Sequence, residues 1–276
     1  MKKLNKQDKK RMINNRLKED YDYLINNGYT VVGIFLQGSQ NYELDYENSD
    51  IDTKAIVVPS LKDIILNKKP VSTTYVKKDN SHVDIKDIRL MFDCFKKQNI
   101  NFIEVLFTKY KYLNPELEEL YKPMLDYNEL IAHYNNYAAV NCIVGMMFEK
   151  NVALCHRYEG LAEKIDKYGY DSKQLHHILR CYEFLNRYIK GEPYKDCLIS
   201  KQKDLLIKIK SNNAYYNKDE AVKIAQETCD KAKEIKNDYM ENTPLKVNTD
   251  VEELMQKVLI DIMTYCLKKE LKESNV

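Results

Sequence analysis

Two aspartates and a Gly-Ser pair are the residues of this sequence best suited to chemistry. Gly38 and Ser39 end one apolar run, and Asp50 and Asp52 open another. If both aspartates lie on a strand, its period of two places their carboxylates on one side and turns Ile51 into the core. Adjacent carboxylates repel each other, and proteins accept that cost mainly where a cation compensates it. The pair therefore predicts a metal site.

The chemistry of these groups favours a metal–nucleotide site. Hard oxygen ligands suit Mg²⁺ or Mn²⁺, and Mg²⁺ commonly bridges one or two protein carboxylates and substrate phosphates. The Gly38-Ser39 turn would add close backbone approach, N–H donors and a hydroxyl, all of which can hold a phosphate. We therefore expect Gly38 and Ser39 to bind nucleotide beside the metal held by Asp50 and Asp52.

A third carboxylate is expected at Asp84, which alternates with apolar neighbours in a further strand-like segment. Asp87 is the competing choice, but it directly precedes a helical run, where an N-cap role explains it. Asn101 and Glu104 match a capping-box pattern farther along. The predicted catalytic and metal-binding set is Asp50, Asp52 and Asp84.

Hydrophobic periodicity predicts an α/β (α+β) fold in two domains. A helix is expected over 7–27, a short helix over 61–66, and strands over 30–36, 51–58, 71–76 and 82–86. Further helices are expected near 129–167, 172–190, 200–211, 217–240 and 250–272. We predict a catalytic domain over 1–112 with a mixed sheet of about four strands. An all-helical domain is expected over 113–276.

The segment GSQNYELDYENSDIDTKAIVVP resembles the signature of the DNA polymerase β-like nucleotidyltransferase superfamily. In this fuller form it is similar to a subfamily of predicted bacterial and phage nucleotidyltransferases, and NINFIEVLF extends the similarity to about residue 107. One departure is Glu43, where that subfamily usually has a glycine. The resemblance implies a polymerase β-like lobe whose aspartates hold two metals about 3.5–4 Å apart. The implied reaction moves a nucleoside monophosphate from a triphosphate such as ATP to an acceptor hydroxyl.

A second group of polar residues lies on the predicted helix 172–190. Lys173, His177 and Arg180 are spaced i, i+4 and i+7 and share one face, which is most simply a solvated face. The stretch YGYDSKQLHHILR resembles a helix of the same subfamily in which the Lys, His and Arg match in spacing. The resemblance implies that the three bind the triphosphate and that Lys173 and Arg180 neutralise its charge.

Bulk composition restricts partners and location. The net charge of +2 gives no strong indication of nucleic-acid binding, and no run of 18 apolar residues predicts a membrane span. The N-terminus is basic but lacks the apolar region of a secretion signal. Seven cysteines show neither a C-x-x-C pair nor zinc-like spacing, so we expect reduced thiols and a cytoplasmic protein.

The acceptor stays open at this stage. An RNA 3′ end, a protein side chain and a small hydroxyl compound are all compatible with the sequence. Two other activities also remain: an oligonucleotide or cyclic-nucleotide synthase, and a regulatory module that binds nucleotide without turnover.

Overall fold

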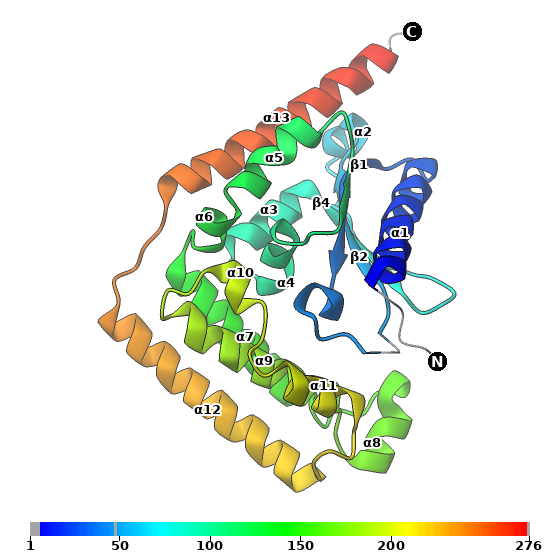
Figure 1. Cartoon of the computed structure of the whole chain (residues 1–276). Helices are drawn as coiled ribbons and strands as arrows, with labels where there is room; N and C mark the ends of the chain where they lie inside the picture. Colours follow the sequence, from blue (N-terminus) through cyan, green and yellow to red (C-terminus); the bar gives the residue numbers. More distant parts are fainter. Residues whose placement is uncertain (1–5, 47–48, 275–276) are drawn as a thin grey trace. The chain divides into compact units, whose positions relative to one another are not determined.

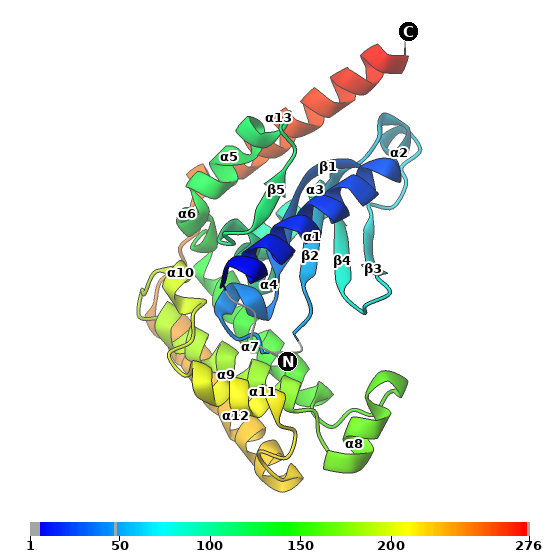
Figure 2. The ribbon, with the colours of Figure 1, turned by 45° about the vertical axis from the view of Figure 1, so that its right-hand side comes forward.

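The computed structural model describes residues 6–46 and 49–274, and it is α+β, as predicted. Within the described residues, one mixed five-stranded sheet has the order β3-β4-β2-β1-β5 (Figure 2). Strand β2 runs parallel to β4, and every other neighbouring pair is antiparallel. The strands are β1 (Thr30–Gln37), β2 (Asp52–Val58), β3 (Ser72–Val76), β4 (His82–Asp87) and β5 (Lys111–Leu113).

The burial of each strand follows from its sequence. The run TVVGIFLQ of β1 is apolar at nearly every position and is buried on both faces. Strand β4 instead alternates buried and half-buried residues, because polar side chains occupy every second position. At the edge of the sheet, β3 is exposed along its whole length. The polar face of β4 and the ends of β1 and β2 are therefore where side chains can do chemistry.

Helices cover both faces of the sheet (Figures 1 and 2). Helix α1 (Lys6–Asn26) buries Ile13, Leu17 and Leu24 in a cluster with one face of the strands. Burying one such side chain stabilises the fold by about 1.5–3 kcal/mol. Helix α3 (Ile88–Lys96) packs on β2 and β4. As predicted, Asp87 is its N-cap and accepts a hydrogen bond from the Arg89 amide at 2.9 Å.

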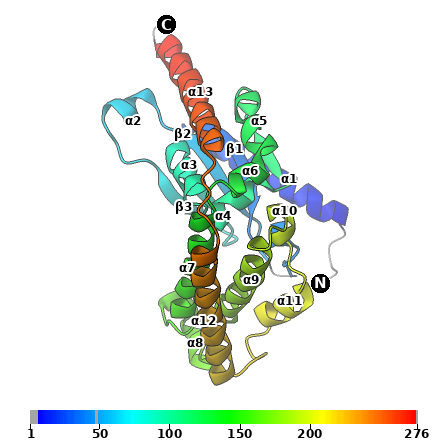
Figure 3. The same cartoon turned by 90° about the vertical axis from the view of Figure 1, so that its left-hand side faces the viewer.

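The last helix of the chain, α13 (Thr249–Ser274), packs against α5 (Glu118–Asp126) and α3, as Figures 1 and 3 show. Its inward residues Met255 and Ile262 are fully buried. The same unit contains the short helices α2 (Leu61–Ile65), α4 (Ile100–Ile103) and α6 (Asn128–Ala132).

A second unit is all helical in its described secondary structure. Helices α7 (Asn136–Ala153), α9 (Ser172–Tyr188) and α12 (Lys218–Asn242) pack together, and α11 (Lys203–Ser211) packs on α9. The short helices α8 (Ala162–Tyr168) and α10 (Tyr194–Cys197) complete it. The single helix predicted over 129–167 is divided, because the Asn135 side chain accepts a hydrogen bond from the Ala138 amide and starts α7 afresh.

The two compact units have different bounds from the predicted domains 1–112 and 113–276. Unit 1 contains residues 6–41, 49–134 and 248–274, and unit 2 contains Tyr42–Tyr46 and Asn135–Val247. The helical unit is therefore inserted between α6 and α13. Hydrophobic periodicity predicts that α13 is a helix with one buried face. It does not predict whether that face packs on unit 1 or on unit 2.

Two sequence-based expectations concern the whole chain. Across 6–46 and 49–274, every helix is too short or too polar to cross a membrane. All seven cysteines are free thiols, as their irregular spacing predicts.

The placement of α13 in unit 1 predicts unequal effects of two substitutions on that helix. Met255 is 0% exposed and Ile260 is 62% exposed. Met255→Ala is expected to lower the free energy of unfolding by about 2–5 kcal/mol, because it leaves a cavity under α13. Ile260→Ala, the matched control, is expected to change it by less than about 0.5 kcal/mol. Urea denaturation measures both, and equal effects would contradict this packing.

Candidate functional site

The Gly-Ser turn and the start of β2 lie at the same end of the sheet. The antiparallel register pairs Gln37, the last residue of β1, with Asp52, the first residue of β2. Gly38 follows Gln37 directly and has a φ of 82°, and a Cβ there would meet nothing within 4 Å. Glycine is therefore needed for the backbone conformation, not for space.

Asn41 holds this turn in place. Its side-chain amide donates to the Leu36 carbonyl at 2.7 Å and accepts from the Thr108 hydroxyl at 2.7 Å. Its backbone amide donates to the Gly38 carbonyl at 3.0 Å. These three hydrogen bonds fix the path of the chain just after β1.

Glu104 lies next to the Gly38-Ser39 turn. The prediction that it forms a capping box with Asn101 is wrong. The N-cap of α4 is Asn99, whose side chain accepts from the Asn101 amide at 3.1 Å. Glu104 is only 4% exposed, and its Oε1 accepts from the Gly38 amide at 3.5 Å. The sequence pattern pointed to a local cap, whereas the partner lies on another element.

Asp52 is held by the neighbouring parallel strand. Its Oδ1 accepts from the His82 backbone amide at 2.9 Å and lies 3.1 Å from His82 Nδ1. His82 is not among the site residues predicted from the sequence. The usable signal was alternation, which puts His82 on the same side of its strand as Asp84.

Asp84 lies on the same face of the sheet as Asp52, since its register partner on β2 is Lys54. Its carboxylate accepts from Thr74 Oγ1 at 2.7 Å and from Gln37 Nε2 at 3.0 Å, and Lys54 Nζ lies 3.6 Å away. Burial alone would raise the pKa of Asp84, but these hydrogen bonds and the charge of Lys54 outweigh it and lower the pKa. Asp84 is therefore kept as an anion.

Lys54 is the buried cation beside Asp84 on this face. Burial lowers its pKa, although the nearby Asp84 opposes that effect. Its Nζ lies 4.1 Å from the centre of the Phe102 ring, a cation–π distance. The sequence signal for Lys54 was its position two residues after Asp52 at the start of an apolar run, which places both side chains on one face of the strand.

Asp50 differs from the prediction. Strand β2 begins at Asp52, so the alternation that would align the two carboxylates does not reach Asp50. Its side chain is exposed, and its backbone carbonyl accepts from Gln40 Nε2 at 3.0 Å. Ile51 packs against the core cluster, as predicted.

The expected three-carboxylate metal cluster is not preassembled. Over residues 6–46 and 49–274, no group of three His, Cys, Asp or Glu side chains could by itself hold a metal ion. Asp52 and Asp84 do share one sheet face, and Mg²⁺ commonly uses only one or two protein carboxylates together with substrate phosphates. These residues fit a cation whose coordination is completed by substrate, rather than a closed protein cage.

The basic face of α9 divides into residues with different environments. Lys173 is exposed in the first turn of the helix, whereas His177 is half-buried. Burial, with the neighbouring His176, lowers the pKa of His177. Arg180 is only 7% exposed, and its guanidinium lies 3.9 Å from the centre of the Tyr42 ring. The Arg180 guanidinium therefore contacts an aromatic ring in this structure.

Within unit 2, further basic residues hold the segment Tyr42–Tyr46. Lys203 forms an ion pair with Glu43, and Lys210 Nζ donates to the Leu44 carbonyl at 3.3 Å. Glu43 has a φ of 59°, the left-handed conformation that glycine adopts freely. The residue that departs from the resembled subfamily therefore keeps the backbone conformation that a glycine would favour.

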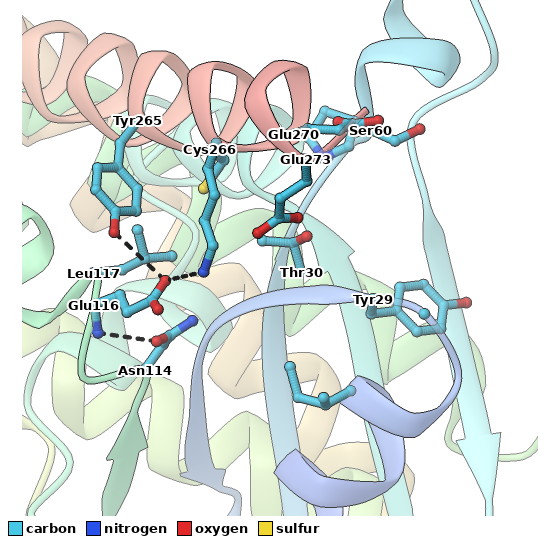
Figure 4. A pocket seen from close by; sticks show the side chains of 14 residues that line it. Tyr29, Thr30, Ser60, Asn114, Glu116, Leu117, Tyr265, Cys266, Glu270 and Glu273 are labelled. Carbon is cyan, nitrogen blue, oxygen red and sulfur yellow. Dashed lines mark hydrogen bonds and ion pairs between the residues drawn. The ribbon is translucent and has the colours of Figure 1, made fainter. Parts of the chain in front are cut away.

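A pocket of about 340 Å³ lies at the opposite end of the sheet, beside the start of β1 and the end of β2. It is lined partly by α13, and Glu116 accepts from Lys269 Nζ at 2.6 Å and from the Tyr265 hydroxyl at 3.5 Å within it. Figure 4 shows Glu116 and Tyr265 in this pocket. None of the predicted site residues lines this pocket.

Comparison with known proteins adds no family assignment: no protein-family model and no curated protein sequence matches the chain.

The lowered pKa of Asp84 predicts a specific dependence of stability on pH. A carboxyl group with a depressed pKa stabilises the folded state above its unfolded pKa, and this stabilisation is lost as pH falls through the folded value. The difference in unfolding free energy between wild type and Asp84→Asn should thus be largest above about pH 5 and shrink towards pH 3. Thr74→Val, which removes one hydrogen bond to Asp84, should shift the same curve less. Urea denaturation across this range measures the effect, and a pH-independent difference would contradict it.

The contact between Arg180 and Tyr42 predicts energetic coupling. In a double-mutant cycle of Arg180→Met with Tyr42→Leu, we expect a coupling free energy of about 1–2 kcal/mol, because the cation and the ring are largely removed from water. Arg187 is the matched control, a nearly buried arginine on α9 bound instead to Glu192 and the Ile199 carbonyl. Arg187→Met and Tyr42→Leu should be additive in urea denaturation. If the effects of Arg180→Met and Tyr42→Leu on the unfolding free energy are additive, the structural role assigned to Arg180 is contradicted.

Proposed function

We propose that this chain is a Mg²⁺-dependent nucleotidyltransferase with a polymerase β-like catalytic lobe. One observation carries the proposal: the register of β1 and β2 places the Gly38-Ser39 turn beside Asp52 at one end of the sheet. A phosphate-binding turn and a metal-binding carboxylate must be adjacent for a metal-bound triphosphate to contact both.

In the proposed reaction, an acceptor hydroxyl attacks the α-phosphorus of a nucleoside triphosphate such as ATP. A bond forms between the acceptor oxygen and the α-phosphorus, the bond from the α-phosphorus to the oxygen that bridges to the β-phosphate breaks, and pyrophosphate leaves. The proton of the hydroxyl passes to solvent water. Mg²⁺ or Mn²⁺, when bound, would offset the phosphate charge and lower the pKa of the acceptor hydroxyl. Positioning and charge neutralisation would supply most of the rate acceleration.

The carboxylates take separate roles in this proposal. Asp52, held by His82, would be the central ligand of the cation, and Asp50 would join it from the exposed segment before β2. Because the pKa of Asp84 is lowered, Asp84 stays ionised, which suits a ligand better than a general base.

The nucleotide would be held through its phosphates. Ser39 would donate its hydroxyl, and Gly38 lets the backbone approach a phosphate without a side chain in between. The resemblance also assigns Lys173 and His177, on α9 of unit 2, to triphosphate binding. Arg180 would act there mainly by fixing Tyr42, the last residue of the 3-10 turn that begins at Ser39.

The acceptor hydroxyl belongs to an RNA 3′ end, a protein side chain or a small molecule, and a nucleotide acceptor would make the chain an oligonucleotide or cyclic-nucleotide synthase. A regulatory module that binds nucleotide without turnover is the non-enzymatic alternative.

Incubation with each α-labelled nucleoside triphosphate and Mg²⁺ or Mn²⁺ tests the activity, first alone, then with total tRNA, then with cell lysate. We expect labelled product and pyrophosphate from wild type, and a rate at least about 100-fold lower from Asp52→Asn, because transition-state charge loses a metal ligand. Asp250→Asn, an exposed acid at the start of α13, is the control and should retain the wild-type rate.

The destination of the label separates the classes. Product from nucleotide alone indicates a synthase, and labelled RNA or protein identifies a macromolecular acceptor. Equal turnover by wild type and Asp52→Asn would reject the proposed site, and nucleotide binding without turnover in every mixture would favour the regulatory module.

A further inference from the structure

A cluster of buried charges lies on the other face of β2, between that strand and α1. Asp20 of α1 is 0% exposed, beside the apolar cluster that contains Ile13, Leu17 and Leu24. Its Oδ2 accepts from Arg16 Nε at 2.8 Å and from Thr53 Oγ1 at 2.7 Å, and its Oδ1 lies 2.5 Å from Lys77 Nζ. The carboxylate therefore ties together α1, β2 and the end of β3.

The same cluster holds the turn between β3 and β4. Arg16 Nη1 donates to Ser81 Oγ at 2.7 Å and lies 3.8 Å from Asp79 Oδ2. The Ser81 hydroxyl in turn hydrogen-bonds Asp79, and the Lys77 amide donates to the Ser81 carbonyl at 2.9 Å. Ser81 is thus fixed by side chain and backbone together.

Both anchored residues are chain neighbours of the groups that form the candidate site. Thr53 directly follows Asp52, and Ser81 directly precedes His82, whose backbone amide donates to Asp52 Oδ1. Because strand residues alternate, Thr53 points to α1 while Asp52 points to the opposite face. The cluster therefore controls the backbone on both sides of the Asp52–His82 hydrogen bond.

Stability alone does not account for such a cluster. Taking charges out of water costs several kcal/mol per ion, and well-packed apolar residues in place of a buried ion pair are often neutral or stabilising. The neighbouring inward positions of α1, such as Leu17 and Leu24, show that apolar residues pack well in this layer. A directional network, in contrast, fixes backbone positions that apolar contacts leave free to slide.

We propose that the buried cluster of Arg16, Asp20, Thr53 and Ser81 is a positioning device that sets the carboxylate of Asp52. The inference rests on the proposed function, in which Asp52 binds the cation. Asp20 contacts no substrate and is a positioning residue, not a catalytic one. A shift of about 1 Å in a reacting geometry can cost about 100-fold in rate, so fixing Asp52 has a large effect.

Thr53 provides the cleanest test, because Thr53→Val keeps the shape and removes only the hydroxyl, and Thr53→Ser restores it. Thr228→Val is the matched control, since the Thr228 hydroxyl donates to the Ile224 carbonyl inside α12. Hydrogen exchange of the His82 backbone amide, followed by NMR, reports whether the bond to Asp52 persists. Asp52→Asn sets the value expected when that bond is weakened.

In Thr53→Val we expect the His82 amide to exchange at least about tenfold faster while the Ile85 amide keeps its rate, because only the strand end is released. kcat should fall at least about tenfold with KM nearly unchanged, since the loss lies in positioning and not in nucleotide binding. Thr53→Ser should recover both readouts, and Thr228→Val should change neither. Wild-type exchange of His82 in Thr53→Val, or failure of Thr53→Ser to recover it, would overturn the inference.

The exchange measurement needs no turnover, so the two proposals fail separately. If wild type transfers no nucleotide, the His82 amide still decides whether the cluster sets Asp52. If turnover is present but Thr53→Val leaves both readouts unchanged, only the positioning role is lost. Ser81→Ala is the second variant, because Asp20→Asn leaves the buried Arg16 and the half-buried Lys77 without their carboxylate and is expected to unfold the protein.

Discussion

The pairing of β2 along both of its edges is the constraint on which the candidate site depends. Its antiparallel register with β1 brings Asp52 opposite Gln37 and so next to the Gly38-Ser39 turn. Its parallel register with β4 brings His82 and Asp84 onto the face that carries Asp52. A slip of one residue in either ladder would turn these side chains to the α1 side. The apolar residues of β2 that pack under α1 therefore also hold the site in register.

Charge balance on that face explains why Asp50, Asp52 and Asp84 do not form a cluster of three adjacent carboxylates there. A carboxylate without a bound cation repels neighbouring carboxylates. Hydrogen-bond donors and cationic side chains of the protein reduce this electrostatic cost. Asp84 has Thr74, Gln37 and Lys54 as partners, while Asp52 has His82. In the proposed function, substrate-bound Mg²⁺ would join a face on which the protein's own donors already compensate part of the carboxylate charge.

The strands were predictable because their side chains alternate, and the failures came where a partner lies far along the chain. Periodicity predicts β1, β2 and β4 almost to the residue. The alternation does not show, however, that pairing with β1 stops at Asp52, so it does not reveal that Asp50 lies outside β2. Glu104 has the spacing of a capping box, yet its partner is the Gly38 amide. Local patterns do not distinguish a solvated arginine from Arg180, whose partner Tyr42 lies in another segment.

Glu43 shows how a sequence departure can preserve a structural requirement. The connection from β1 to β2 needs a left-handed residue at this point, and glycine meets that need without strain. A glutamate in the same conformation carries a cost of roughly 1–2 kcal/mol. Here the ion pair with Lys203, the Lys210 bond to Leu44 and the stacking of Arg180 on Tyr42 oppose that cost. Within unit 2, side-chain contacts from α9 and α11 thus hold the path of Tyr42–Tyr46.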